Sequence, residues 1–367
     1  MKTIGKPCAG KSHARFDEEV QSCENRNSGL TLSGKSMVLS FRLGGLSSRM
    51  NMNKKSRIYV AGHAGMVGSA ICRYLGARGF KNIVSRNGDE LDLRNSQAVE
   101  SFFKAEKPEL VFLCAAKVGG IKINSKEPAS FLYDNLMISA NIIHNSYLHG
   151  VKKLCFLGSS CIYPRECPQP MKEEYLMTGP FEPTNEGYAV AKFAGYKLAY
   201  YYAIQYRMNT ISIMPCNLYG KNDHFDLEKA HVLSSLVKRF CDAIENRMDS
   251  VTLWGTGSAK REFMNVDDFA EAALFLMDKW ENPEIINVGT GSDISIKDLA
   301  KKIAGFAGFK GKILWDHSMP DGMLRKCLDI SKINSLGFIP RITLDEGIKE
   351  MIKIYIENKK LGEFSNK

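Results

Sequence analysis

Short apolar runs alternate with longer segments of helical spacing from about residue 54 onward. Short apolar runs are typical of strands buried on both faces, and apolar residues that recur every three or four positions are typical of helices that cover a sheet. The pattern predicts strands at residues 58–61, 82–85, 110–115, 153–157, 210–214 and 285–288. It predicts helices at residues 66–79, 95–106, 128–149 and 188–207.

This alternation favours an α/β fold with a doubly wound parallel sheet and right-handed crossovers. Ligands of such sheets bind beyond the carboxyl ends of the strands. After Gly220 the pattern breaks into shorter, more varied pieces. We therefore expect the sheet domain at residues 54–220, with later returns near residues 262–290. A smaller C-terminal α/β lobe, interleaved with it, is expected mainly at residues 221–360.

The first 53 residues show neither period and are rich in Ser, Gly and Asn. Their eight Lys or Arg residues are typical of a targeting peptide. Their four acidic residues count against one, because targeting peptides are poor in acids. Met52-Asn-Lys-Lys is typical of the start of a protein. We predict a disordered upstream extension, with a targeting peptide as the alternative.

The formal charge of the chain is +10, and the first fifty residues contribute +4 of it, from eight Lys or Arg and four Asp or Glu. The remainder is spread along the chain, which fits an anionic small molecule at least as well as a polynucleotide. No apolar run reaches the roughly 20 residues of a membrane span. We expect no nucleic-acid partner and no membrane insertion.

The sequence contains ten cysteines, and no pair has the spacing of metal ligands. Five of them lie inside apolar runs: Cys72, Cys114, Cys155, Cys216 and Cys327. Reduced, buried thiols indicate a reducing compartment. We therefore expect no metal site and a cytoplasmic protein.

A glycine-rich turn, Gly62-His-Ala-Gly65-Met-Val-Gly68, follows the first predicted strand and precedes the first predicted helix. Such glycines let the backbone approach a pyrophosphate, which then lies at the N-terminus of the helix. At the end of the second strand, Arg86 lies where an acidic residue would bind the ribose of NAD. Because a guanidinium pairs with a 2′-phosphate, we predict NADP(H) as cofactor. A solvated surface arginine is the alternative.

Tyr188 and Lys192 lie four residues apart, and therefore on one face of the predicted helix at residues 188–207. The Lys192 cation favours a phenolate, so we expect a lowered Tyr188 pKa and proton exchange with a carbonyl oxygen. Ser159 follows the fourth strand, where a hydrogen-bond donor to that oxygen is required. This order of motifs predicts an oxidoreductase that acts at a carbonyl carbon.

With these motifs, the chain from Arg57 to about Asn358 resembles the extended short-chain dehydrogenases/reductases. The segments that carry the resemblance are Val60-Ala-Gly-His-Ala-Gly-Met-Val-Gly-Ser-Ala-Ile71, Ala115-Ala-Lys-Val-Gly-Gly-Ile121, Phe156-Leu-Gly-Ser-Ser-Cys-Ile-Tyr-Pro164, Asn217-Leu-Tyr-Gly220 and Pro320-Asp-Gly322. The most similar members epimerise carbons 3 and 5 of GDP-4-keto-6-deoxymannose and then reduce carbon 4 with NADPH. The resemblance implies a Rossmann domain, this activity and a GDP-sugar substrate.

The resemblance also implies the roles of individual residues. A ketone at carbon 4 acidifies the hydrogens of both neighbouring carbons, so one base and one acid on opposite faces suffice for both epimerisations. Cys161 and His231 match the family's base and acid. Cofactor contacts are implied at Gly62, Gly65, Met66, Val67, Gly68, Arg86, Leu157, Gly158, Ser160, Lys192, Pro215, Asn217, Leu218 and His231. Substrate contacts are implied at Arg239, Trp254, Arg261 and Asp321, with Lys326 as a further phosphate contact.

Several alternatives stay open at this point. Cys161 could be inert packing, and His231 could cap a helix at residues 232–246. Cys161-Ile162 lie where related dehydratases carry an Asp-Glu pair, which disfavours a dehydratase. Two departures from the family pattern are present. Cys216 departs on the nicotinamide side of the cofactor site, and Met323-Leu324 depart in the pocket for the substrate nucleotide.

The alternative enzyme is a relative that acts on another GDP-keto-deoxysugar, such as a colitose-type synthase. A catalytically inactive NADP sensor is disfavoured, because such proteins typically lose the Tyr or the Lys. Helices 128–149 and 188–207 carry more apolar and aromatic residues than one sheet-facing stripe requires. Relatives use this helix pair as a dimer interface, so the resemblance implies a homodimer.

Overall fold

The computed structural model describes residues 52–227, 230–319 and 321–362. Apart from Met52 and Asn53, the predicted N-terminal extension lies outside the described residues. Among those that are described, no helix combines the length and the apolar character needed to cross a membrane.

Six parallel strands form the central sheet, at the positions where the sequence predicted strands. In spatial order they are β2 (Ile83–Val84), β1 (Ile58–Ala61), β3 (Leu110–Leu113), β4 (Lys153–Leu157), β5 (Thr210–Pro215) and β9 (Ile285–Val288). Four of them, β1, β3, β4 and β9, are buried over their whole length, which explains their continuous apolar runs. The predicted α/β class and doubly wound Rossmann sheet are confirmed.

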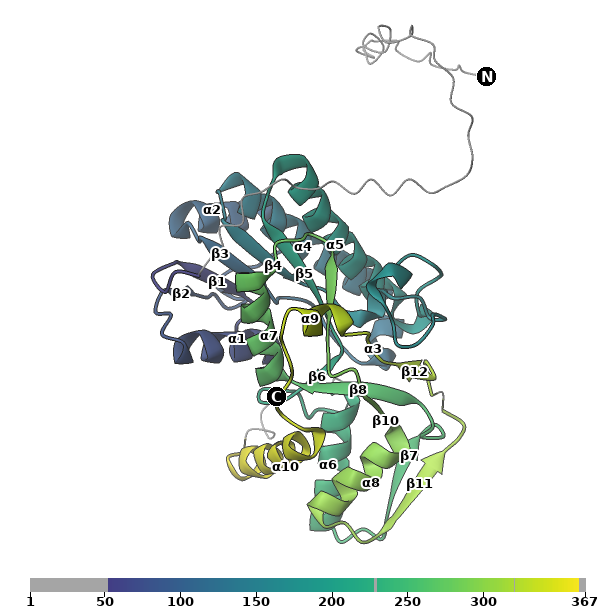
Figure 1. The fold of residues 1–367 in the computed structure, drawn as a ribbon. Helices are drawn as coiled ribbons and strands as arrows, with labels where there is room; N and C mark the ends of the chain where they lie inside the picture. Colours follow the sequence, from purple (N-terminus) through teal and green to yellow (C-terminus); the bar gives the residue numbers. More distant parts are fainter. Residues whose placement is uncertain (1–51, 228–229, 320, 363–367) are drawn as a thin grey trace, which may run out of the picture. The chain divides into compact units, whose positions relative to one another are not determined.

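Helices cover both faces of this sheet (Figure 1). One layer contains α1 (Met66–Ala77) and α7 (Val266–Lys279), and the other contains α2 (Ser96–Glu106), α4 (Pro128–Leu148) and α5 (Glu186–Tyr206). The four predicted helices are thereby confirmed to within two residues at each end. Shorter helices in the connections are α3 (Ile121–Lys126), η1 (Ser160–Ile162), η2 (Glu173–Tyr175), η3 (Pro183–Asn185) and α9 (Ser331–Ser335).

The strand order reverses between β1 and β3. From β1 the chain goes outward to β2, then crosses back to β3 and continues through β4 and β5 in the opposite direction. The loops that follow β1 and β3 therefore diverge at the carboxyl ends of the strands. Open α/β sheets bind their ligands at such a reversal.

A smaller lobe packs its own hydrophobic cluster, which includes Phe240, Leu299, Ile303 and Met351. Its strands are β6 (Asn217–Tyr219), β8 (Lys260–Asn265), β10 (Asp293–Ser295) and β12 (Arg325–Lys326) in one sheet, and β7 (Ser250–Trp254) with β11 (Lys312–Asp316) in another. Its helices are α6 (Val232–Glu245), α8 (Ile296–Ala307) and α10 (Leu344–Lys360). The chain leaves the central sheet after β5, returns for α7 and β9, and leaves it again.

Candidate active site

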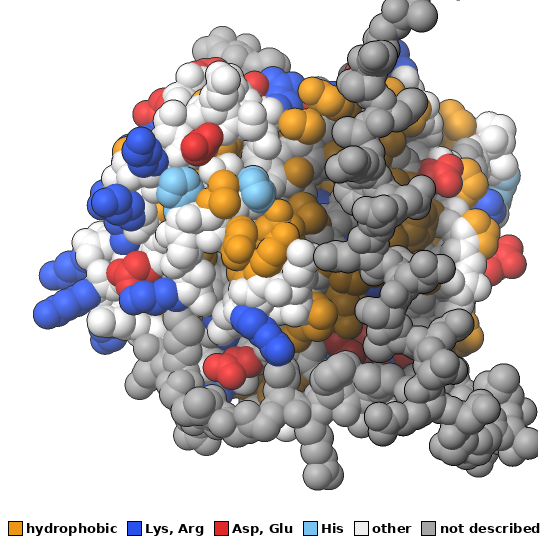
Figure 2. Space-filling model, turned by 90° about the horizontal axis from the view of Figure 1, so that it is seen from above, with side chains coloured by type: hydrophobic (Ala, Val, Ile, Leu, Met, Phe, Trp, Pro, Cys, Tyr) orange, Lys and Arg blue, Asp and Glu red, His pale blue; other side chains and the backbone are white. Residues whose placement is uncertain are grey.

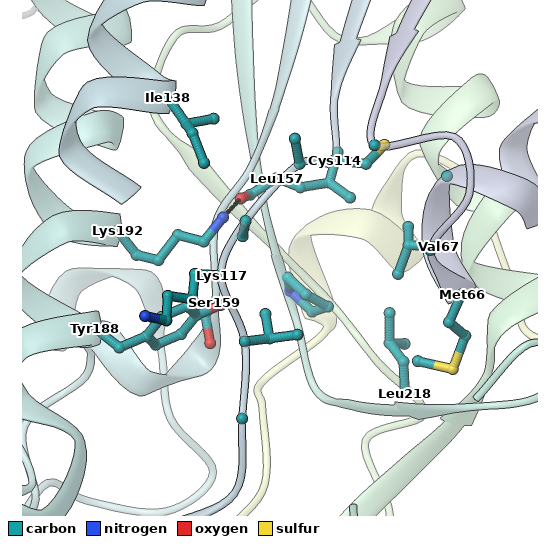
Figure 3. Close-up of a pocket in the computed structure, with 18 of the residues that line it drawn as sticks. Met66, Val67, Cys114, Lys117, Ile138, Leu157, Ser159, Tyr188, Lys192 and Leu218 are labelled. Atoms are coloured by element: carbon teal, nitrogen blue, oxygen red, sulfur yellow. Dashed lines mark hydrogen bonds between the residues drawn. The ribbon is translucent and has the colours of Figure 1, made fainter. Parts of the chain in front are cut away.

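A cavity of about 780 Å³ opens at the carboxyl ends of β1, β3, β4 and β5. The glycine loop after β1 lies on one side of it and the first turn of α5 on the other, and the smaller lobe contributes His231 and Lys326. Every residue predicted to be catalytic or to bind the cofactor lines this cavity. In Figure 3, Met66, Val67 and Leu218 face Ser159, Tyr188 and Lys192 across it.

The three glycines of the loop have different tasks. Gly62 has a φ of +83°, and a Cβ there would lie 2.7 Å from the Ala115 backbone. A Cβ at Gly68 would lie 2.1 Å from the Gly62 carbonyl oxygen, so this glycine lets α1 pack closely on the turn. At Gly65, the N-cap of α1, a Cβ would meet only the Gly62 oxygen, at 3.5 Å. Gly65 thus leaves room for a pyrophosphate at the helix N-terminus.

Arg86 lies just beyond β2 and lines the cavity with a half-exposed side chain. Its guanidinium donates to the Ser85 carbonyl oxygen at 2.8 Å and pairs with Glu106. It also lies over the Phe102 ring, with Cζ 5.7 Å from the ring centroid. These contacts hold the guanidinium beside the cavity.

Ser159, Tyr188 and Lys192 meet where β4 ends and α5 begins. Lys192 is only 3% exposed, and its Nζ donates to the Leu157 carbonyl oxygen at 2.8 Å (Figure 3). The same Nζ lies 5.9 Å from the centroid of the Tyr188 ring. The ammonium is therefore near the phenol, but its hydrogen bond goes to the backbone.

Burial dominates the electrostatics of this pair. It raises the pKa of Tyr188, while a hydrogen bond with Ser159 acts in the opposite direction. Burial also lowers the pKa of Lys192, to about 8. The expected lowering of the Tyr188 pKa by Lys192 is wrong for this structure, because the cost of removing the phenolate from water exceeds the stabilisation by the hydrogen bond with Ser159.

Cys161 lies in the η1 turn directly after Ser159, which is its N-cap. The Ser159 hydroxyl oxygen accepts a hydrogen bond from the Cys161 backbone N–H at 3.2 Å. Burial acts to raise the pKa of the thiol, but the Lys326 charge and hydrogen bonds from Ser159, Lys326 and Asn185 outweigh it, so the net shift is downward. The other buried thiols, such as Cys155, have raised pKa values. Cys161 is thus set apart from inert packing cysteines.

His231 is the N-cap residue of α6, but its side chain makes no capping hydrogen bond. It is exposed and lines the cavity, which leaves its imidazole available to a ligand. Asp223 also lines the cavity; it accepts hydrogen bonds from the Ser234 hydroxyl and from the His224 backbone N–H. Burial raises the Asp223 pKa, and His231 acts against this shift.

The four predicted substrate residues lie outside the cavity lining, in the smaller lobe. Three of them are near one another. Trp254 is 57% exposed at the end of β7, two residues before Thr256, whose backbone N–H and hydroxyl donate to Asp321 at 2.7 and 2.6 Å. Burial lowers the Arg261 pKa, and Asp321 opposes that shift. Arg239 lies separately on α6.

Comparison with known proteins agrees with this geometry. Residues 58–289 match the model of the NAD dependent epimerase/dehydratase family. The chain belongs to this family. This membership confirms the resemblance to extended short-chain dehydrogenases/reductases.

Relatives within the epimerase/dehydratase family match most of the chain. The chain is 52% identical to "Putative GDP-L-fucose synthase 2" of Arabidopsis thaliana, over 85% of the chain and 95% of the relative. It is 46% identical to the GDP-L-fucose synthase of Escherichia coli (strain K12), over 83% and 98%. It is 34% identical to the GDP-L-colitose synthase of Yersinia pseudotuberculosis, over 83% and 99%.

A solved structure of the GDP-mannoheptose C4 reductase from Campylobacter jejuni, with NADP bound, is also similar. Its TM-score is 0.76 at 40% sequence identity, and the match covers 83% of this chain and 99% of the reductase.

In this family member, sequence reasoning missed two cavity residues that interact with the candidate acid/base groups, Asn185 by a hydrogen bond to Cys161 and Asp223 electrostatically with His231. Asn185 donates from Nδ2 to Cys161 Sγ at 3.2 Å, and its position three residues before Tyr188 was the available signal. Asp223 is the other, just after the turn at Gly220. The spacing of Asn185 to Tyr188 does not reveal its contact with Cys161, and Asp223 has no spacing signal.

Proposed function

We propose that this protein converts GDP-4-keto-6-deoxy-D-mannose to GDP-L-fucose, by epimerisation at carbons 3 and 5 followed by NADPH-dependent reduction of the 4-keto group. The observation that carries the proposal is that Cys161 and His231 share one cavity with Ser159, Tyr188 and Lys192. A simple dehydrogenase requires only the last three. The relatives named GDP-L-fucose synthase support this substrate better than the more distant colitose synthase does.

The cofactor in this proposal is NADP(H), which supplies the hydride for carbon 4. Gly62, Gly65 and Gly68 would hold its pyrophosphate at the N-terminus of α1. Arg86 would contact the 2′-phosphate. The similar Campylobacter reductase was solved with NADP bound, which supports this choice.

Epimerisation in this proposal begins with Cys161. The thiolate removes the proton from carbon 3 or carbon 5, an S–H bond forms, and the electron pair of the C–H bond moves toward the 4-keto oxygen. The hydroxyls of Ser159 and Tyr188 would donate hydrogen bonds to that oxygen as its charge grows. His231 then delivers a proton to the opposite face of the same carbon.

Reduction in this proposal takes place in the same cavity, at the keto oxygen that Ser159 and Tyr188 already bind. Tyr188 donates its proton to the oxygen on carbon 4 as the carbonyl is reduced, and Ser159 holds that oxygen in place. Below a pH of about 8, Lys192 is charged and stabilises the phenolate that is left.

The GDP part is proposed to bind along the smaller lobe. Arg261 and Arg239 would pair with the pyrophosphate, because guanidinium groups form charge-assisted hydrogen bonds with phosphate oxygens. The exposed Trp254 ring would stack on the base, and Asp321 would accept hydrogen bonds near it.

The product of the complete reaction tests this function. The protein is incubated with GDP-4-keto-6-deoxymannose and NADPH in deuterated water, and the sugar is identified by NMR. We expect GDP-L-fucose with deuterium at carbons 3 and 5. A product that keeps the manno configuration would contradict the proposed epimerase activity, and unconsumed NADPH would contradict the proposed reductase activity.

Substitution Cys161→Ser separates the two stages. We expect deuterium exchange at carbons 3 and 5 to fall by about 100-fold or more, because general base catalysis contributes about that much. Reduction of an already epimerised intermediate should continue. Cys167→Ser is the matched control, because Cys167 is a half-buried thiol on the same loop. Retained exchange in Cys161→Ser would contradict the role of the thiol.

We also propose a homodimer formed through α4 and α5. Hydrophobic side chains gather on the face shown in Figure 2, and several aromatic residues on these two helices are exposed. The exposed large side chains are Tyr133, Tyr147, Leu148, Tyr201, Ile204 and Tyr206. An apolar surface of this kind on adjacent helices is typical of an interface.

A further inference from the structure

The Cys161 thiol has a cation in contact with it that comes from the far end of the chain. Lys326 Nζ lies 3.4 Å from Cys161 Sγ, and Asn185 Nδ2 lies 3.2 Å from the same sulfur. Both nitrogen atoms are donors, so the sulfur accepts two hydrogen bonds, one of them from an ammonium group. We propose that Lys326, assisted by Asn185, holds Cys161 as a thiolate and so makes it a base near neutral pH.

This inference deepens the proposed function, because it explains how the proposed epimerisation base is ionised. An ordinary cysteine has a pKa of about 8.5 and is mostly protonated at neutral pH. A neighbouring ammonium and hydrogen bonds to sulfur both favour the ionised form. Lys326 therefore acts on the thiol, which is a different task from the phosphate contact expected from the sequence.

Other groups also face the thiol. Besides Lys326 on β12, Lys192 on α5 and Arg261 on β8 interact electrostatically with Cys161. Tyr188 is the neighbouring acid, and Ser159 the neighbouring hydroxyl. Of the three cations, Lys326 is the one that donates a hydrogen bond to the sulfur, since the Lys192 ammonium donates to Leu157 and Arg261 donates to the Lys260 carbonyl.

The fold holds Lys326 in place from both sides. Strand β12 pairs with β8, with Lys326 opposite Arg261. The next residue, Cys327, donates its N–H to Gln169 at 3.0 Å, and Leu328 donates its N–H to Glu262 at 2.8 Å. Glu262 is fully buried and also accepts from the Thr290 and Gly291 backbone at 2.6 and 2.7 Å.

A lysine fixed in this way differs from a mobile surface cation. Its backbone is attached to the end of β9 through Glu262 and to the loop after η1 through Gln169. Because Cys161 lies in the η1 turn that follows β4 of the central sheet, and Lys326 lies in the smaller lobe, the base is complete only where the two parts meet.

The ionisation of Cys161 can be measured without turnover. Iodoacetamide alkylates thiolates, and mass spectrometry of the Cys161 peptide gives its rate at each pH. For the wild type we expect the midpoint of the rate against pH to lie below about 8.5. In Lys326→Met the midpoint should rise by about one unit or more, so that the rate at neutral pH falls roughly tenfold. Asn185→Ala should cause a smaller rise.

Two further variants define the controls. Lys326→Arg keeps the charge and should restore most of the low midpoint. Lys260→Met removes a lysine from β8, beside the same small sheet, and should leave the midpoint unchanged. Circular dichroism melting checks that each variant is folded; if Lys326→Met does not fold, Lys326→Gln takes its place.

Steady-state kinetics distinguish the two possible tasks of Lys326. A thiolate-stabilising lysine predicts that Lys326→Met lowers kcat for deuterium exchange at carbons 3 and 5 with little change in KM, and that higher pH restores part of the rate. An unchanged alkylation midpoint together with a raised KM would overturn the proposal in favour of a phosphate contact. Failure of the proposed function would be visible separately, as the absence of GDP-L-fucose from the wild-type reaction, whatever the thiol titration shows.

Discussion

At the scale of single residues, charged side chains in the cavity differ in how much water they retain. Arg86 is half exposed and already paired with Glu106, whereas Lys192 is almost fully enclosed. A half-exposed guanidinium keeps its charge and can gain a further phosphate contact at little cost. An enclosed ammonium loses hydration, and this shifts its protonation and the stability of the fold. These two residues therefore give predictions of different kinds.

Arg86→Ala should change cofactor preference. Loss of a charge-assisted hydrogen bond costs about 1.5–3 kcal/mol, so we expect KM for NADPH to rise roughly 10- to 100-fold while KM for NADH changes little. Arg57→Ala is the matched control, because Arg57 pairs with the same Glu106 but does not line the cavity. An unchanged ratio of the two KM values in Arg86→Ala would show that this arginine does not bind the 2′-phosphate.

Lys192→Met should alter how stability depends on pH. The folded protein has a Lys192 pKa of about 8, whereas an unfolded lysine has one of about 10.4. Between these values the unfolded chain binds a proton that the folded protein has released, so this group adds stability as pH rises, by up to roughly 1.4 kcal/mol per unit.

Buried thiols with raised pKa values, such as Cys155, oppose this trend in the whole protein. The quantity to measure is therefore the difference between wild type and Lys192→Met in the free energy of unfolding by urea. Between about pH 8 and pH 10, we expect the free energy of unfolding of the wild type to rise relative to that of Lys192→Met. A difference that is constant with pH would mean that the Lys192 pKa is not lowered.

At the scale of elements, the turn from β1 into α1 depends on how closely the helix approaches the strand. Gly68 and Gly76 both lie in α1, yet their surroundings differ. A Cβ at Gly68 would meet the Gly62 backbone, whereas a Cβ at Gly76 would meet no atom within 4 Å. The two positions separate the effect of packing from that of helix propensity.

Gly68→Ala should therefore destabilise the protein, by about 3 kcal/mol or more, since backbone must move to admit the methyl group. Gly76→Ala should stabilise it by roughly 0.5–1 kcal/mol, because alanine has the better helix propensity. Urea unfolding of both variants tests the pair. Equal effects at the two positions would contradict the close contact.

The elements also show what could be predicted from the sequence. Most of the central strands were predictable because they are buried apolar runs with their own local signal. The strands of the smaller lobe were not: β10 and β12 have three and two residues, and they are defined by their pairing with β8. Their formation depends on contacts between distant segments, which no local pattern records.

The same limit applies to the candidate site. Ser159, Tyr188 and Lys192 follow from strand ends and helical spacing. The contact between Cys161 and Lys326 joins residues 165 positions apart and depends on where β12 lies. Motifs place the reactive groups on their elements, but only the folded chain shows which of them touch.

At the scale of the whole molecule, three aromatic residues of α4 and α5 form a cluster that is partly exposed. Tyr147 stacks on Tyr206 with ring centroids 4.4 Å apart, and Tyr202 contacts both rings. A second copy that packs on this group would remove a large apolar area from water. The helix pair is thus the surface on which the proposed homodimer can be tested.

Tyr206→Arg should produce a monomer. Tyr206 is 41% exposed, and a charge placed in the proposed apolar interface would be buried without a partner. Analytical ultracentrifugation measures the mass in solution. Ile356→Arg on α10, where the original side chain is 43% exposed, is the matched control and should remain dimeric. A wild-type protein that sediments as a monomer at every concentration would contradict the proposed dimer.

The path of the chain through the two lobes has a consequence for synthesis. The edge strand β9 consists of residues 285–288, which the ribosome makes after β6, α6, β7 and β8 of the smaller lobe. A nascent chain that stops at residue 220 exposes the side of β5 that β9 covers in the complete sheet. Most of the central sheet therefore emerges first but cannot finish folding first. Until β9 appears, the open edge of β5 needs protection from other nascent chains.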